Sequence, residues 1–91
     1  MKKIFVFGSE LCPDCVVLKA FLQQHEVRFT FIDIQESLGK LKMFLKYRDS
    51  LALFDEVKRA GGIGIPCLVA DDGEWITLDP PSEAMLARLR S

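Results

Sequence analysis

The sequence lacks an excess of charge of either sign. Its 91 residues hold 12 lysines and arginines against 13 aspartates and glutamates, which leaves a formal net charge of -1. A protein that binds nucleic acid broadly needs a positive surface to neutralise the phosphates. The charge balance therefore argues against a nucleic-acid partner.

The sequence also lacks a long hydrophobic run. Residues 1–7 have a basic start and an apolar stretch, but the stretch breaks at Gly8, Ser9 and Glu10. A secretory signal or a membrane span needs a longer apolar segment. We therefore expect a cytoplasmic protein with no membrane partner.

With 49% hydrophobic residues, the chain has enough apolar surface for one core, so we expect a single domain over residues 1–91. We also expect this domain to be a monomer.

Cysteine and histidine are scarce. Three cysteines are too few, and odd in number, for a disulfide scaffold. A zinc site would need four ligands, and the candidates of the usual types are Cys12, Cys15, Cys67 and His25. His25 is predicted at the far end of the helix that follows Cys12, so a cysteine-histidine hydrolase has no nearby base. Redox exchange is the favoured interpretation, with zinc binding or inert core thiols as alternatives.

The first third of the chain is patterned as two strands around a helix. An apolar run at residues 3–7 predicts a buried strand, residues 13–25 repeat apolar positions at helical spacing, and residues 27–34 alternate as a strand does. Two strands joined by a helix favour a parallel, right-handed crossover. This predicts a strand-helix-strand unit.

The remainder is patterned as helices, a hairpin and a last helix. Residues 36–60 read as helical, with Leu38 on their apolar stripe and a break at Asp49 and Ser50, which are typical caps of a helix start. Residues 66–78 predict a β-hairpin around a turn-forming sequence, and residues 83–90 predict a helix. The chain is therefore predicted to adopt an α/β fold.

Two of the cysteines form the motif Cys12-Pro13-Asp14-Cys15 directly after the first predicted strand. Pro13 suits the first position of a helix, so Cys12 is predicted to cap that helix and Cys15 to lie in its first turn, close enough for a disulfide. The amino end of a helix stabilises negative charge, so Cys12 is expected to be the nucleophilic thiolate and Cys15 the resolving thiol. Asp14, an acid in the first turn, complements the helix dipole. In a functional role, its charge beside Cys12 would oppose thiolate formation and make the pair less oxidising.

This motif, together with Gly64-Ile65-Pro66 before the hairpin, resembles the glutaredoxins of the thioredoxin-like superfamily. The resemblance spans nearly the whole chain and implies a thioredoxin-like three-layer sandwich with a four-stranded mixed sheet. It also implies that Pro66 is cis and that the backbone of Ile65 pairs with a bound cysteine-containing peptide. The lengthened second helical region resembles that of a glutaredoxin-related bacterial subgroup.

The resemblance further implies glutathione as the reducing co-substrate, with no tightly bound cofactor and no metal. Lys58 would then meet the glycine carboxylate of glutathione, and Asp79 or Ser82 would hold its γ-glutamyl end. The chain departs from the family at Ser9, where many glutaredoxins carry a lysine, and at Pro80-Pro81, near the place of an expected glycine pair. Both departures bear on glutathione rather than on the cysteine chemistry.

These features predict a thiol-disulfide oxidoreductase that reduces glutathione mixed disulfides or protein disulfides through the Cys12-Cys15 dithiol. One alternative is a thioredoxin-like protein-disulfide reductase fed by a flavoprotein reductase. Another is a non-enzymatic iron-sulfur carrier or redox sensor that uses Cys12 with glutathione.

Two further features are expected to be structural. Cys67 follows Pro66, and strand alternation should point its side chain away from the active edge as a small buried hydrophobe. The alternative for Cys67 is a regulatory disulfide. The basic stretch of Lys40, Lys42, Lys46 and Arg48 is expected to be a solvated helix face.

Overall fold

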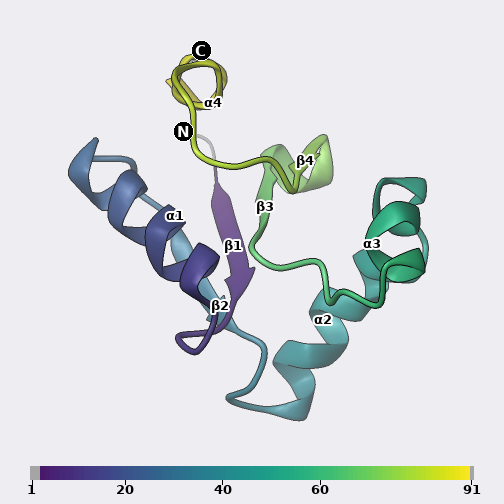
Figure 1. The fold of residues 1–91 in the computed structure, drawn as a ribbon. Coiled ribbons are helices and arrows are strands. Elements are labelled where there is room, and N and C mark those ends of the chain that lie inside the picture. Colours follow the sequence, from purple (N-terminus) through teal and green to yellow (C-terminus); the bar gives the residue numbers. More distant parts are fainter. Residues whose placement is uncertain (1–2, 91) are drawn as a thin grey trace.

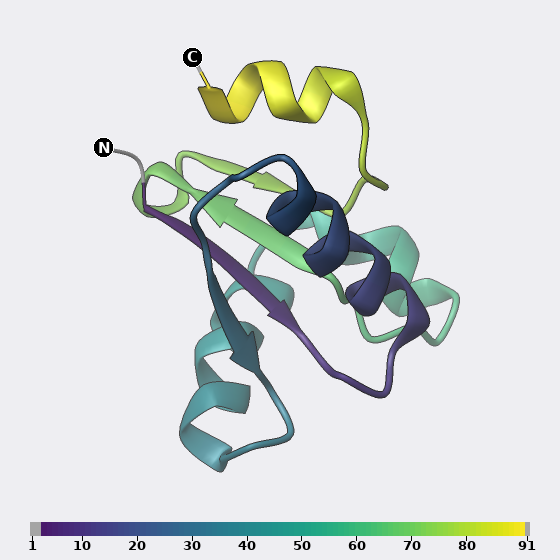
Figure 2. The same cartoon turned by 90° about the vertical axis from the view of Figure 1, so that its left-hand side faces the viewer.

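The computed structural model describes residues 3–90, which form three layers around a four-stranded sheet (Figures 1 and 2). Within these residues, no helix is long and apolar enough to cross a membrane. The α/β order predicted from the sequence is confirmed. The elements are β1 (Ile4–Gly8), α1 (Pro13–Gln24), β2 (Thr30–Asp33), α2 (Leu38–Arg48), the 3-10 turn η1 (Ala52–Phe54), α3 (Asp55–Arg59), β3 (Cys67–Ala70), the 3-10 turn η2 (Asp71–Gly73), β4 (Trp75–Thr77) and α4 (Glu83–Arg90).

The strands follow the order β2-β1-β3-β4, and the sheet is mixed as predicted. β1 runs parallel to β2 and antiparallel to β3, with Phe7 opposite Ile32 on one side and Cys67 on the other. β3 and β4 form the predicted antiparallel hairpin. Because side chains alternate along a strand, Phe7 and the next residue, Gly8, face opposite sides of the sheet.

Each face of the sheet has its own apolar core. On one face, β1 and β3 pack against α1 and α4. The buried residues there are Ile4, Val6, Leu18, Leu22, Leu68, Ala70, Met85 and Leu89. On the other face, the strands pack against α2 and η1, through the buried residues Phe7, Ile32, Ile34, Phe44, Phe54, Cys67 and Val69. The two cores confirm the sandwich.

The long helical region differs from its prediction in detail. Ser37 caps the start of α2 by accepting the Lys40 N–H at 3.1 Å. Asp49 is the residue at the carboxyl end of α2, and the Ser50 hydroxyl donates back to a carbonyl of the last turn. The prediction that these two residues start a helix is therefore wrong. Leu38 is 74% exposed, so it is not part of the buried stripe.

The second strand is shorter than the sequence pattern indicates. Only residues 30–33 pair with β1, although the alternation of apolar side chains begins at Val27. The Val27 N–H donates to the Leu22 carbonyl at 2.9 Å, directly after Glu26 with its φ of 59°. The backbone at Val27 thus completes the helix end instead of the strand.

Candidate active site

Cys12 lies where the sequence predicts, as the residue that caps α1. Its backbone is extended, and its carbonyl accepts the N–H groups of Cys15 and Val16, both at 3.1 Å. Pro13 occupies the first helical position, where a backbone donor would have no partner within the helix. Cys12 is half-buried and Cys15 is fully buried, and both are free thiols. The more accessible sulfur is therefore the one at the helix start.

Burial raises the pKa of the Cys15 thiol from 9.0 to about 12. A backbone hydrogen bond at Ser9 opposes this shift, while a hydrogen bond to Cys12 and the negative charges of Cys12 and Asp14 add to it. Cys15 therefore keeps its proton at neutral pH. Its burial disfavours a negative charge on the Cys15 sulfur.

The end of β1 supports the buried thiol. A Cβ atom placed on Gly8 would lie 2.8 Å from the Cys15 Sγ and 3.0 Å from the Phe31 ring. No side chain larger than hydrogen fits there without displacing the sulfur. In the sequence, Gly8 marks only the end of an apolar run. Strand alternation, which turns the last residue of β1 toward α1, was the signal that could have identified it.

A hollow of about 200 Å³ opens beside Cys12. Its lining residues are Ser9, Leu11, Cys12, Ile34, Gln35, Ile63 and Ile65, and none of them is charged. The Ser9 hydroxyl accepts the Leu11 N–H at 3.1 Å and donates to the Gln35 side chain. The Ser9 hydroxyl is thus bonded within the lining, and the hollow offers a mainly apolar surface.

The loop before β3 brings Ile65 to the same hollow. The Ile65–Pro66 peptide bond is cis, which confirms the expectation drawn from the resemblance. Since Cys67 lies opposite Phe7, the backbone of Ile65 approaches the segment that leads from β1 to Cys12. The structure therefore brings together Cys12, Cys15 and Ile65.

The residues predicted to bind glutathione lie elsewhere. Asp79 and Ser82 line a different hollow, near Trp75. The Ser82 hydroxyl accepts the Met85 N–H at 3.1 Å at the start of α4. Lys58 lies on α3, 3.9 Å from the Asp55 carboxylate. None of the three predicted residues lines the hollow beside Cys12.

Neither the remaining cysteine nor the histidine lines the hollow beside Cys12. Cys67 has no exposed surface, lies in the core on the α2 side, and has its pKa raised to about 12 by burial. His25 ends α1, at the opposite end from Cys12. Across residues 3–90, no three histidine, cysteine or acidic side chains form a group suited to a metal ion. The zinc ligands considered from the sequence are therefore not assembled.

Comparisons with known proteins agree with this geometry. A family model for glutaredoxins matches residues 4–76. The chain belongs to the glutaredoxin family. An uncharacterized protein of Haemophilus influenzae is 39% identical over 76 residues, which cover 84% of this chain and 88% of that protein. Family membership and the paired thiols indicate a thiol redox function.

Solved structures establish the same fold for this glutaredoxin-family chain. The thioredoxin-like protein BC3987 superposes with a TM-score of 0.62 at 24% identity, covering 94% of this chain and 97% of that one. A single-residue variant of that protein gives a TM-score of 0.63 at 24% identity, with 97% and 99% covered. The thioredoxin-like fold expected from the resemblance is confirmed.

Proposed function

We propose that this protein is a thiol-disulfide oxidoreductase that reduces protein disulfides or glutathione mixed disulfides. The observation that carries the proposal is the unequal environment of the two thiols. Cys12 lies half-buried at the amino end of α1, and Cys15 is buried one turn further with its pKa raised to about 12. Such a pair separates the attacking sulfur from the resolving one.

In the proposed reaction, the Cys12 thiolate attacks one sulfur of the substrate disulfide. A bond forms between Cys12 and that sulfur, and the other substrate sulfur leaves as a thiolate. Cys15 then gives its proton to solvent and attacks the Cys12 sulfur. The bond between Cys12 and the substrate breaks, and the second substrate sulfur leaves as a thiolate. The substrate gains two electrons, and the protein becomes oxidised to a Cys12-Cys15 disulfide.

The mixed disulfide itself favours the second step. Once Cys12 is bonded to the substrate, its sulfur no longer carries a negative charge. It also no longer accepts a hydrogen bond from Cys15 as a thiolate. Two of the causes that raise the pKa of Cys15 are thereby removed. The resolving thiol thus becomes easier to deprotonate when it is needed.

We propose that two glutathione molecules reduce the Cys12-Cys15 disulfide and leave joined as oxidised glutathione, which restores the dithiol. In this proposal the protein acts in the cytoplasm as a single-domain monomer without a tightly bound cofactor or metal. Lys58, Asp79 and Ser82 are the proposed glutathione contacts. Their alanine variants should raise the KM for glutathione while leaving the rate of Cys12 alkylation unchanged. Steady-state kinetics with a glutathionylated peptide measure this, and an unaltered KM in all three variants would remove them from the proposed site.

The hollow beside Cys12 favours a second candidate, a protein-disulfide reductase fed by a flavoprotein. Glutathione carries two carboxylates and one ammonium group, and the hollow lining has no charged side chain to meet them. An apolar peptide segment fits this surface better. The two candidates share the cysteine chemistry and differ in the electron donor.

Two cysteine variants test the shared chemistry. Cys12→Ser should abolish reduction of both a glutathionylated peptide and insulin, because the attacking sulfur is lost. Cys15→Ser should retain the peptide reaction, since free glutathione can release the Cys12 mixed disulfide, and should lose insulin reduction. Cys67→Ser is the matched control for removing a thiol. Activity that survives Cys12→Ser would refute the proposal.

The donor is tested by supplying the wild-type protein with either of two reducing systems. One is glutathione with glutathione reductase, and the other is thioredoxin reductase with NADPH. Reduction rates of the same two substrates are compared at equal reductase activity. Faster turnover with glutathione supports the first candidate, and faster turnover with thioredoxin reductase supports the second.

A further inference from the structure

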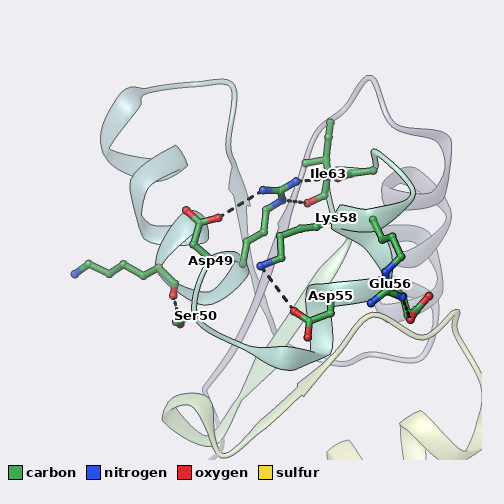
Figure 3. Close-up of polar contacts among 10 residues, drawn as sticks. Asp49, Ser50, Asp55, Glu56, Lys58 and Ile63 are labelled. Carbon is green, nitrogen blue, oxygen red and sulfur yellow. Dashed lines mark hydrogen bonds and ion pairs between the residues drawn. The ribbon is translucent and has the colours of Figure 1, made fainter.

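Arg48, the last residue of α2, is bonded to the loop that precedes β3. Its Nε donates to the Ile63 carbonyl at 2.7 Å, and its Nη2 donates to the Gly62 carbonyl at 2.9 Å. Its Nη1 lies 3.5 Å from the Asp49 carboxylate, so Asp49 and Ile63 lie on either side of the guanidinium group in Figure 3. The Arg48 side chain is only 24% exposed. The expectation that Arg48 is part of a solvated face is therefore wrong.

The same loop is fitted closely to the helices beneath it. The Gly62 N–H donates to the Val57 carbonyl at 2.8 Å. Gly64 has a φ of 101°, and a Cβ atom there would lie 2.8 Å from the buried ring of Phe54. These contacts place the loop backbone against α3 and η1. Arg48 is the side chain that bonds two successive carbonyls of this loop.

The loop also forms one wall of the hollow beside Cys12. Ile63 and Ile65 are its contributions to the lining, and the Ile63 side chain is 56% exposed. Arg48 holds the carbonyls of Gly62 and of Ile63 itself, and Ile65 follows two residues later. A displacement of those carbonyls would move the wall against which a substrate of Cys12 must fit.

We propose that Arg48 is a positioning residue for the substrate: by holding the Gly62 and Ile63 carbonyls, it fixes the loop against which the peptide bonded to Cys12 docks. This inference rests on the proposed function of the Cys12-Cys15 pair. The substrate class that follows is an extended polypeptide disulfide with an apolar side chain next to its cysteine, because the wall is apolar and uncharged. Arg48 touches neither sulfur, so its effect is on binding rather than on thiol reactivity.

Arginine is suited to this position for a physical reason. Its planar guanidinium presents several N–H donors in a fixed arrangement, so one side chain bonds two neighbouring carbonyls at once. A lysine ammonium is a point donor on a flexible stem and does not hold two carbonyls in one fixed plane. The proposal therefore distinguishes Arg48 from a general requirement for positive charge at the end of α2.

Arg48→Ala tests the proposal. With a peptide disulfide that carries an apolar residue beside its cysteine, the KM should rise by about tenfold while kcat changes by less than about twofold. The rate at which iodoacetamide labels Cys12 should stay at the wild-type value. Backbone order parameters of Ile63 and Ile65, measured by NMR, should fall from about 0.85, which is typical of rigid backbone, toward about 0.6. An unchanged KM or unchanged order parameters would overturn the inference.

Two further variants separate positioning from simple stabilisation. Lys46→Ala removes a different cation from the last turn of α2, at an exposed position, and should leave the KM at the wild-type value. Arg48→Lys keeps the charge and should still show a raised KM, so recovery of the wild-type KM would refute the role of two bonded carbonyls. A wild-type protein that reduces no disulfide would overturn the proposed function itself, whereas an active wild type with an unaffected Arg48→Ala variant overturns this inference alone.

Discussion

The Cys15 sulfur packs directly against the backbone of Gly8. A Cβ atom at Gly8 would lie 2.8 Å from the Cys15 Sγ, a closer contact than real Cβ atoms make with non-bonded atoms. The end of β1 and the first turn of α1 are thus fitted to each other through one thiol and one missing side chain. This contact leaves no room for the Cys15 sulfur to move toward β1.

Gly8→Ala should disturb both folding and the dithiol. We expect the free energy of unfolding of the reduced protein to fall by about 1–3 kcal/mol, because the added methyl group overpacks a filled site. Formation of the Cys12-Cys15 disulfide should slow, since the sulfur is displaced. Urea denaturation and timed oxidation measure the two effects. Gly39 lies in α2, where an added Cβ atom would lie 3.9 Å from the Ser37 Oγ and meet nothing closer. Gly39→Ala should therefore raise the free energy of unfolding by about 0.5–1 kcal/mol.

Because burial raises the pKa of its thiols, the protein is predicted to lose stability at alkaline pH. Burial raises the pKa of Cys67 from 9.0 to about 12, so the unfolded chain releases this proton first as pH rises. The stabilisation is complete below pH 9.0 and is lost between there and about 12, with a slope of at most ~1.4 kcal/mol per pH unit. Urea titrations of the reduced protein from about pH 8 upward should show this. The Cys67→Ala variant should lose stability less steeply, and an equal slope would contradict the assignment.

The Ser9 hydroxyl is predicted to stabilise the turn before Cys12. It is 5% exposed, accepts the Leu11 N–H and donates to the Gln35 side chain. Ser9→Ala should lower the free energy of unfolding by about 1–2 kcal/mol, and Gln35→Ala by less, because Gln35 is exposed. A double-mutant cycle should return a coupling of about 0.5–1.5 kcal/mol. Strictly additive effects would mean that the two side chains do not interact in solution.

Asp14 is predicted to restrain the reactivity of the pair. It lies exposed in the first turn of α1, and its charge is among the causes that raise the pKa of Cys15. A carboxylate two residues from Cys12 also repels negative charge on that sulfur, so Asp14→Asn should speed labelling of Cys12 by iodoacetamide about two- to threefold at low salt, and salt should reduce the effect by screening the charge. Glu83→Gln neutralises an acid in the first turn of α4 and should change nothing. Slower labelling of the Asp14 variant would contradict the prediction.

Much of the fold was predictable because local signals agree with the packing. The apolar run at β1, the proline after Cys12 and the turn sequence of the hairpin each define an element that the structure contains. The end of α2 was less predictable. Asp49 and Ser50 are common at both helix starts and turns, and the choice between these roles depends on which carbonyls are left unbonded nearby.

The cysteine pair could be located from its spacing, but its surroundings could not. Gly8, Gln35 and Arg48 act through contacts with segments distant in the sequence, and pattern alone does not show such contacts. Arg48 reads as one more surface cation until the loop around Gly62 folds back onto α2. The glutathione residues were inferred from family resemblance, and the hollow beside Cys12 does not include them.

The position of Cys67 limits which disulfides can form within the oxidised protein. The sheet stands between this thiol and the redox pair, with Cys67 on the α2 side and Cys15 on the α1 side. A third sulfur within reach of Cys12 would divert it into an unproductive bond. Because the β-sheet separates Cys67 from the pair, Cys15 is the thiol available to form an intramolecular disulfide with Cys12.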